Sequence, residues 1–274
     1  MTWLEIWTEF VRYHIKYYNQ ISKVTKPLLD CFEIVCVDYL RTYKSGRFTY
    51  LSSRPECTEY YLSEQCYRYD PYLKHPDLYK TGFLWLENSR SINFQKFICN
   101  IGHKHNVYSP LMMIERGMDY IEMFCFSGKT DEAVRMLHLK HSQLLKTFAT
   151  YYKKELGFLL HETGEAGFSL IDLQGESFYT DCPDPAIKTD SIHAFLRALG
   201  KTAEVERASS LSSRERDCLR LLLRGNSAKD TATELNLSQR TVEFYLENVK
   251  NKLNCGGKRE LFSVASEFNN LGLL

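Results

Sequence analysis

The chain has 274 residues, a formal net charge of +1, 44% hydrophobic and 25% charged residues, and nine scattered cysteines. This composition is that of a folded chain of two domains, and it excludes large-scale disorder and any argument for nucleic-acid binding from overall charge. Because no stretch has the roughly 20 uncharged residues of a membrane span, and because the odd number of cysteines shows no close pairing, we expect a cytoplasmic protein without membrane contact.

The N-terminal half of the chain alternates helices and short strands. Residues 1–19 place apolar side chains at helical spacing between charged ones, which predicts an amphipathic helix and not a signal peptide. Further helices are expected at 55–67 and 92–105. Strands are expected at 33–41 and 47–52, joined by a turn at Gly46, and at 83–87, 107–114 and 120–126. This order favours a central antiparallel sheet flanked by helices over a parallel, doubly wound sheet.

The middle of the chain begins with a strong helical pattern that then weakens. Residues 131–156 predict a long helix that closes the first domain, contributes to a dimer contact, or does both. A strand is expected at 168–173, a loop at 181–185, a short helix at 191–199 and a polar linker at 200–210. We therefore divide the chain into a first domain at 1–156, an extension and linker of unassigned role at 157–210, and a C-terminal domain at 211–274.

The C-terminal domain has the clearest periodicity and divides into four short helices. Ser212 with Glu215 three residues later predicts a capping box at the start of the first helix, and Gly225 predicts its end. Ser227 and Ser238 are expected to cap the second and third helices. The third helix has an apolar stripe and an exposed polar face. Held by a short predecessor through a tight turn, such a helix has the geometry that enters the major groove of DNA.

The residues of this domain resemble the LuxR-type helix-turn-helix. The resemblance is carried by Leu211-Ser-Ser-Arg-Glu-Arg, by Arg224-Gly225 and by residues 237–253. It implies binding to double-stranded DNA. The residues expected to face base edges are Glu243, Phe244 and Glu247, and those expected to contact phosphates are Lys229, Arg240, Lys250 and Lys252.

Two glutamates of the third helix depart from the family pattern. That family often has basic residues where this chain has Glu243 and Glu247. A carboxylate near phosphates is repelled unless it accepts a hydrogen bond from cytosine N4, so we expect these glutamates to select bases and not to add affinity. The alternative is that both are solvated charges that form local pairs with Lys250.

The order of elements before residue 156 is similar to the ligand-binding domain of LuxR-type quorum-sensing regulators. In that family a tryptophan, a tyrosine four residues later and an aspartate before proline surround an acylated homoserine lactone. Here these positions are Cys57, Tyr61 and Asp70, and Trp85 follows where a second aromatic residue is expected. The resemblance implies an α+β sensor domain with a small-molecule pocket at these four residues. The alternative is that the aromatic residues belong to an ordinary core and that Asp70 organises a turn.

The chemistry of this set favours a pocket but not a lactone. Cys57 and Tyr61 lie one helical turn apart and face the same way, and a buried Asp70 can accept a hydrogen bond from a ligand amide. A thiol is a poor substitute for the indole N–H that donates to the lactone carbonyl in the family. The ligand is therefore expected to differ from an acyl-homoserine lactone, or to be absent.

The combined features predict a sequence-specific transcription regulator controlled by a small molecule, which acts as a homodimer on a two-fold symmetric promoter site. The alternative is a ligand-independent regulator whose first domain serves protein interaction or dimerisation. No enzyme, cofactor or metal site is expected. Residues 127–130 lack the first glycine of a phosphate-binding loop, and His138 and His141 lack further metal ligands.

Overall fold

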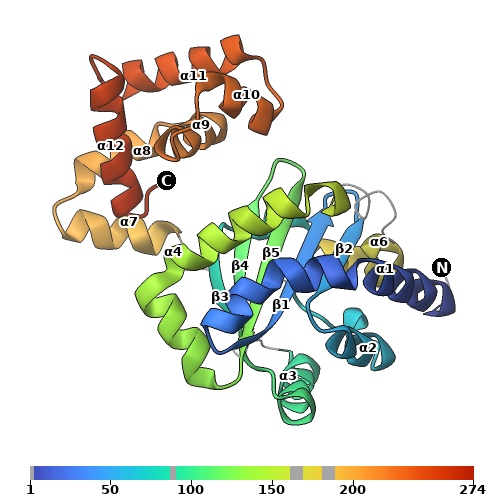
Figure 1. The fold of residues 1–274 in the computed structure, drawn as a ribbon. Helices are drawn as coiled ribbons and strands as arrows, with labels where there is room; N and C mark the ends of the chain where they lie inside the picture. Colours follow the sequence, from blue (N-terminus) through green and yellow to red (C-terminus); the bar gives the residue numbers. More distant parts are fainter. Residues whose placement is uncertain (1–2, 87–90, 161–168, 181–188) are drawn as a thin grey trace. The chain divides into compact units, whose positions relative to one another are not determined.

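The computed structural model describes residues 3–86, 91–160, 169–180 and 189–274 (Figure 1). The chain divides into two compact units, Met1–Asp184 and Pro185–Leu274. Among the described residues, every helix is too short or too polar to span a lipid bilayer. The predicted fold class is confirmed, because an antiparallel sheet flanked by helices forms the first unit and the second unit is all helical.

The first unit is built around a five-stranded antiparallel sheet with the strand order β2-β1-β5-β4-β3. The five strands predicted before residue 130 are all present, with small differences at their ends. They are β1 (Ile34–Tyr43), β2 (Phe48–Ser52), β3 (Gly82–Trp85), β4 (Tyr108–Arg116) and β5 (Tyr120–Gly128). The predicted turn between β1 and β2 contains Gly46 at φ +81°, in the left-handed region that glycine adopts without strain.

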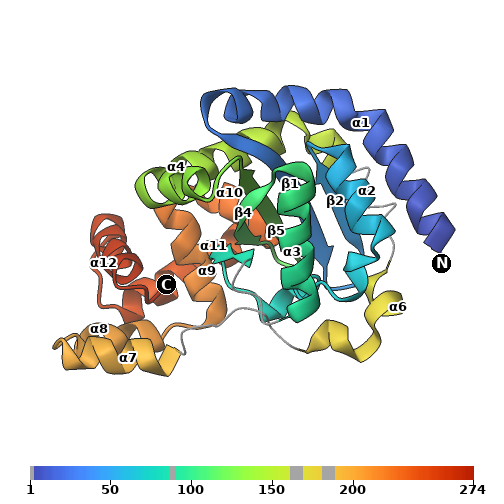
Figure 2. The same cartoon turned by 90° about the horizontal axis from the view of Figure 1, so that it is seen from below.

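Helices cover both faces of this sheet, as Figures 1 and 2 show. The helices α1 (Trp3–Cys31) and α4 (Asp131–Glu155) lie on one face, and α2 (Pro55–Ser63) and α3 (Ile92–His105) lie on the other. α1 extends well beyond the predicted residues 1–19, because Ile21, Val24 and Leu28 continue its buried stripe. α4 is interrupted at His141, whose backbone is not helical.

Successive strand residues point to opposite faces of the sheet. On β1, Val37 and Tyr39 belong to the core shared with α1 and α4, whereas Cys36 and Leu40 belong to the core shared with α2 and α3. This alternation follows from the period of two in an extended strand. It decides which side chains reach the site described below.

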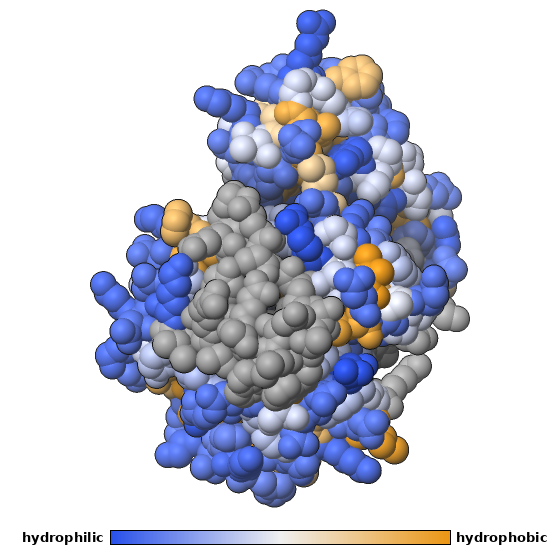
Figure 3. Space-filling model, turned by 90° about the vertical axis from the view of Figure 1, so that its right-hand side faces the viewer, coloured by the Kyte–Doolittle hydropathy of each residue, from blue (hydrophilic) through white to orange (hydrophobic). Residues whose placement is uncertain are grey.

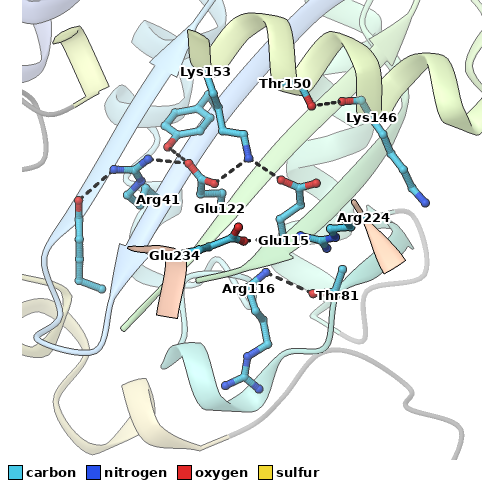
Figure 4. Close-up of polar contacts among 12 residues, drawn as sticks. Arg41, Thr81, Glu115, Arg116, Glu122, Lys146, Thr150, Lys153, Arg224 and Glu234 are labelled. Atoms are coloured by element: carbon cyan, nitrogen blue, oxygen red, sulfur yellow. Dashed lines mark hydrogen bonds and ion pairs between the residues drawn. The ribbon is translucent and has the colours of Figure 1, made fainter. Parts of the chain in front are cut away.

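A buried charge cluster joins α4 to the sheet (Figure 4). Glu122 of β5 accepts a hydrogen bond of 2.7 Å from the Tyr39 hydroxyl and forms ion pairs with Arg41 at 2.6 Å and with Lys153 of α4 at 3.1 Å. The Lys153 ammonium also pairs with Glu115 of β4 at 2.6 Å. These two cations outweigh the burial of Glu122 and hold its pKa below the usual range. Lys153 thus fixes the end of α4 over two neighbouring strands.

The strand predicted at 168–173 is wrong. Leu170–Gln174 form the helix α6, followed by a 3-10 turn at Gly175–Tyr179. The Ser169 hydroxyl accepts a hydrogen bond from the amide of Asp172 and so caps α6. Leu170 and Phe178 are fully buried in the core beside α2 and α3. The loop predicted at 181–185 lies outside the described residues.

The second unit consists of α7 (Thr189–Ala198), α8 (Thr202–Ser209), α9 (Ser213–Leu223), α10 (Ala228–Leu235), α11 (Gln239–Lys252) and α12 (Lys258–Asn270). The last four confirm the predicted helices. The linker predicted at 200–210 is wrong for most of its length, because α8 is helical. Val205 and Ala208 of α8 are buried in the same core as Leu253 and Phe268. This core explains why a polar segment becomes part of the C-terminal unit.

Candidate functional site

Capping interactions define the starts of α9, α10 and α11. The Ser212 hydroxyl accepts from the Glu215 amide, and a Glu215 carboxylate oxygen accepts from the Ser212 amide at 2.7 Å, which confirms the predicted capping box. Ser227 caps α10 with Asp230 in the same way. The Ser238 hydroxyl accepts from the third amide of α11 at 3.0 Å. Each cap satisfies amides that a helix cannot satisfy itself.

A tight turn places α11 after α10. Asn236 has φ +50° in the left-handed region and ends α10, and Ser238 then caps α11. Val242 and Val249 are fully buried and hold α11 against α9 and α10. This is the expected helix-turn-helix, with one face of α11 left to the solvent.

The exposed face of α11 carries the residues predicted to contact bases. Glu243, Phe244 and Glu247 are all exposed, and the Phe244 side chain is 62% accessible although it is large and apolar. Arg240 lies exposed beside them, and Lys229 is exposed on α10.

Local pairs engage part of this charged surface. Lys250 forms an ion pair with Glu247, as the alternative interpretation expected. Glu243 has no ion pair with Lys250, and its carboxylate accepts a hydrogen bond of 2.8 Å from the Gln239 side-chain amide. Exposed pairs of this kind contribute little to stability and exchange readily with other partners.

Lys252 makes contacts that the sequence did not predict. Its ammonium lies 2.8 Å from the carboxylate of Glu215, which is only 3% exposed, and donates to the Ser210 carbonyl at 3.1 Å. Burial opposes ionisation of Glu215, but the Lys252 ammonium and the Ser212 backbone amide outweigh it and lower its pKa. Lys252 therefore ties the end of α11 to the start of α9.

A cavity in the first unit lies between the sheet and the helices α2 and α3. It contains about 660 Å³ of space outside the protein atoms, part of it continuous with the solvent. Most of its wall is apolar and includes Leu40, Leu86, Phe94, Phe97, Ile98, Ile101, Val107, Pro110 and Met112.

Two tyrosine–carboxylate pairs form the main polar part of this wall. The Tyr61 hydroxyl donates to one oxygen of Asp70 at 2.8 Å, and the Tyr72 amide donates to the other at 2.8 Å. The Tyr50 hydroxyl donates to Asp38 at 2.9 Å. The rings of Tyr50 and Tyr61 stack with their centroids 5.9 Å apart, so the two pairs are neighbours.

Burial disfavours the charged form of both carboxylates. It raises the pKa of Asp70 to about 6, although the Tyr72 amide, the Tyr61 hydroxyl and the charge of Lys74 favour ionisation. Burial also raises the pKa of Asp38 against hydrogen bonds that include the one from Tyr50. Among the described residues that line the cavity, none is lysine, arginine or histidine.

Three of the four predicted ligand residues line this cavity together: Cys57, Tyr61 and Asp70. The prediction for Trp85 is wrong. Its side chain lies on the opposite face of the sheet, where the Arg135 guanidinium is 5.0 Å from its ring centroid. Because strand residues alternate between faces, the cavity is reached instead by its neighbour Leu86.

The family comparison bears on the C-terminal part of the chain. Residues 209–265 match the model of the bacterial regulatory proteins of the luxR family. The C-terminal helices form a LuxR-type helix-turn-helix. This agrees with the prediction of a DNA-binding module at the C-terminal end.

A curated relative matches the same LuxR-type segment. It is described as the uncharacterized transcriptional regulatory protein YvfU of Bacillus subtilis (strain 168), and it is 42% identical over 57 residues. The match covers 21% of this chain and 28% of the relative. The chain thus spans about a quarter of the length of that relative.

Solved structures of other proteins are similar to the chain over greater lengths but at low identity. Escherichia coli SdiA is 15% identical, with a TM-score of 0.39, over 97% of this chain and 98% of that chain. SdiA in complex with octanoyl-rac-glycerol is 14% identical, with a TM-score of 0.33, over 94% and 92%. Full-length FixJ from B. japonicum is 22% identical, with a TM-score of 0.23, over 53% and 68%. These likenesses are weak and lend no property to the first unit.

The residues ahead of the LuxR-type module that sequence reasoning missed are Asp38 and Tyr50. Both belong to predicted strands, and Asp38 alternates with Cys36 and Leu40 on the face that lines the cavity. A carboxylate at such a position in a strand was the available signal, because buried charges are rare unless they serve a partner or ligand.

Proposed function

We propose that the protein is a transcription regulator that binds specific DNA sequences through α11 and responds to a small molecule in the cavity of its first unit. The observation that carries the DNA-binding part is the exposed face of α11 within a LuxR-type helix-turn-helix. A short helix anchored by Val242 and Val249 and exposed on its other side suits the major groove.

The roles within this face follow from the chemistry of the side chains. Arg240, Lys229 and Lys250 supply positive charge for phosphates, which sets the position of the module on the duplex. Phe244 offers an apolar surface for a thymine methyl group, and Glu243 can accept from cytosine N4. The pair between Glu247 and Lys250 would open or shift when Lys250 meets a phosphate.

Control by a small molecule is supported by the cavity and by the gathering of Cys57, Tyr61 and Asp70 in its wall. An apolar enclosure with a few convergent polar groups is the usual form of a ligand site. The Cys57 thiol is a weak donor where a lactone carbonyl would need a strong one. A ligand other than an acyl-homoserine lactone therefore fits the site better.

A homodimer is the expected DNA-bound form. One module reads few base pairs, and two modules about 34 Å apart would meet successive major grooves on one face of the duplex. The face seen in Figure 3 is mostly hydrophilic, with apolar side chains in a few small patches. On α4, Leu139, Leu144 and Tyr151 are exposed. These residues offer a dimer contact, and they also favour the alternative that the first unit acts as an interaction module without a ligand.

The proposal is tested by selecting duplexes from a randomised pool with the purified full chain, at low salt, with and without an extract of its host. Enrichment of a two-fold symmetric motif is expected. A pool that remains random in both conditions would contradict sequence-specific binding. Mass spectrometry of the solvent extract of denatured protein separates the two alternatives, because a small molecule recovered repeatedly supports sensing.

A further inference from the structure

The cavity contains a second carboxylate, Asp38, that lies in the middle of its sheet wall. In the sheet register Asp38 lies opposite Cys125 of β5 on one side and Ser52 of β2 on the other. Its strand neighbours on the same face, Cys36 and Leu40, also line the cavity. The first unit therefore places a charged group on a central strand, where an apolar residue would ordinarily complete the core.

The polar side chains of the wall are two carboxylates together with hydroxyls and thiols, and among the described residues that line it there is no cationic side chain. The hydroxyl protons of Tyr50 and Tyr61 are already donated to Asp38 and Asp70. The Cys36 thiol lies 3.6 Å and 3.7 Å from the two oxygens of Asp38, and a thiol is only a weak donor. Asp38 also has a hydrogen bond with the Ser52 side chain, but no cation of the wall pairs with either carboxylate.

The cations nearest to these carboxylates are engaged elsewhere. The Lys74 ammonium donates to the Ser177 carbonyl at 2.7 Å and to the Gln174 amide oxygen at 3.2 Å. The Arg54 guanidinium binds Glu56 at 2.7 Å and the His105 carbonyl at 3.1 Å. Neither side chain lines the cavity. The charge of the cavity wall is therefore negative wherever its carboxyls are ionised.

We infer that the cavity selects an amphiphilic amine, whose ammonium group faces Asp38 and Asp70 and whose apolar part lies against Phe94, Phe97 and Ile101. This inference rests on the proposed ligand-binding function and names the ligand class. An ammonium group supplies three strong donors and a positive charge, which compensates carboxylates that are costly to bury alone. A ligand with a carboxylate or phosphate head is repelled by the ionised carboxyls.

Calorimetric titration of the full chain with hexylamine, hexanol and hexanoate tests the inference at neutral pH. The three probes share an apolar chain and differ in the charge of the head group. Hydrogen bonds to charged groups are worth roughly 1.5–3 kcal/mol, so hexylamine is expected to bind about tenfold or more tightly than hexanol. Hexanoate is expected to bind most weakly.

Two variants test whether Asp38 is the source of the preference for hexylamine over hexanol. Asp38→Asn keeps the size of the side chain and removes its charge, and it is expected to abolish most of the preference for hexylamine while leaving hexanol binding unchanged. Asp30→Asn, at an exposed position on α1, is the matched control and should keep the full preference.

Equal binding of hexylamine and hexanol to the wild-type chain, or tighter binding of hexanoate, would overturn the amine inference and leave ligand binding itself standing. An unchanged preference in Asp38→Asn would overturn the role of Asp38. Failure of all three probes to bind would overturn the amine inference, while the duplex selection still decides the DNA-binding proposal separately. The wild-type comparison does not depend on the folding of any variant.

Discussion

Asp70 shows how the burial of one carboxyl makes stability depend on pH. Its pKa is raised to about 6 by burial, so the folded state prefers the protonated carboxyl. The stabilisation from that preference is present below the pKa of about 4 that the unfolded chain shows, and it is lost as the pH rises through about 6.

We therefore expect the first unit of the wild-type chain to lose up to about 3 kcal/mol of this contribution between about pH 4 and pH 7.5. Asp70→Asn has no such carboxyl and should lose less over the same range. Urea unfolding of both proteins at the two pH values measures the difference. Equal losses in wild type and variant would show that Asp70 is not the titrating group.

Lys252 provides a second residue-scale prediction, because its ammonium neutralises the buried carboxylate of Glu215. Lys252→Ala leaves that carboxylate without its cation, and we expect the second unit to lose roughly 1–3 kcal/mol in free energy of unfolding. Lys250→Ala removes only an exposed pair and should change stability by less than about 1 kcal/mol. Urea unfolding of both variants distinguishes the roles, and equal effects would refute the structural role of Lys252.

Individual site residues were predictable where local spacing determines them. Tyr61 follows Cys57 by one helical turn, and both reach the cavity as expected. Trp85 could not be placed in the same way, because a shift of one residue along a strand reverses the face. Asp38 belongs to a predicted strand. Its place in the cavity wall could not be predicted, because it depends on long-range packing that also stacks the rings of Tyr50 and Tyr61.

At the scale of elements, the contact between α4 and the sheet depends on Glu122. Its carboxylate lies between Arg41 and Lys153, and its side chain is 5% exposed. Glu122→Gln removes the charge that compensates two partly buried cations, and we expect a loss of roughly 3–5 kcal/mol in the stability of the first unit. The matched change Glu115→Gln, at a side chain that is 26% exposed, should cost clearly less. Thermal unfolding measures both, and a smaller loss for Glu122→Gln than for Glu115→Gln would contradict this role.

Elements with a sustained pattern were predicted well, whereas short ones were not. The strands and the LuxR-type helices combine periodic apolar residues with clear turns or caps, such as Gly46 and Ser212. α6 and α8 are short and mostly polar at the surface, and their formation depends on burying Leu170 and Val205 in cores made by distant residues. Such tertiary contacts override weak local preference.

At the scale of the whole molecule, the two units differ in the polar side chains that they offer to a binding partner. The first has a cavity whose wall contains two carboxylates, and the second has an exposed helix face with positively charged neighbours. The sequence predicted both units from their patterns. The net charge of +1 gave no indication of the second, because most of its basic residues are balanced by acidic residues of the same unit.

The central claim is that α11 binds DNA through its exposed face. Its most direct test is fluorescence anisotropy of the full chain on a selected duplex at increasing salt, for wild type, Arg240→Ala and the distant control Lys23→Ala. We predict tight, salt-dependent binding by wild type and control, and for Arg240→Ala a weaker affinity with a salt slope reduced by about one. Absence of binding by the wild-type chain at low salt, with and without an extract of its host, would contradict the claim.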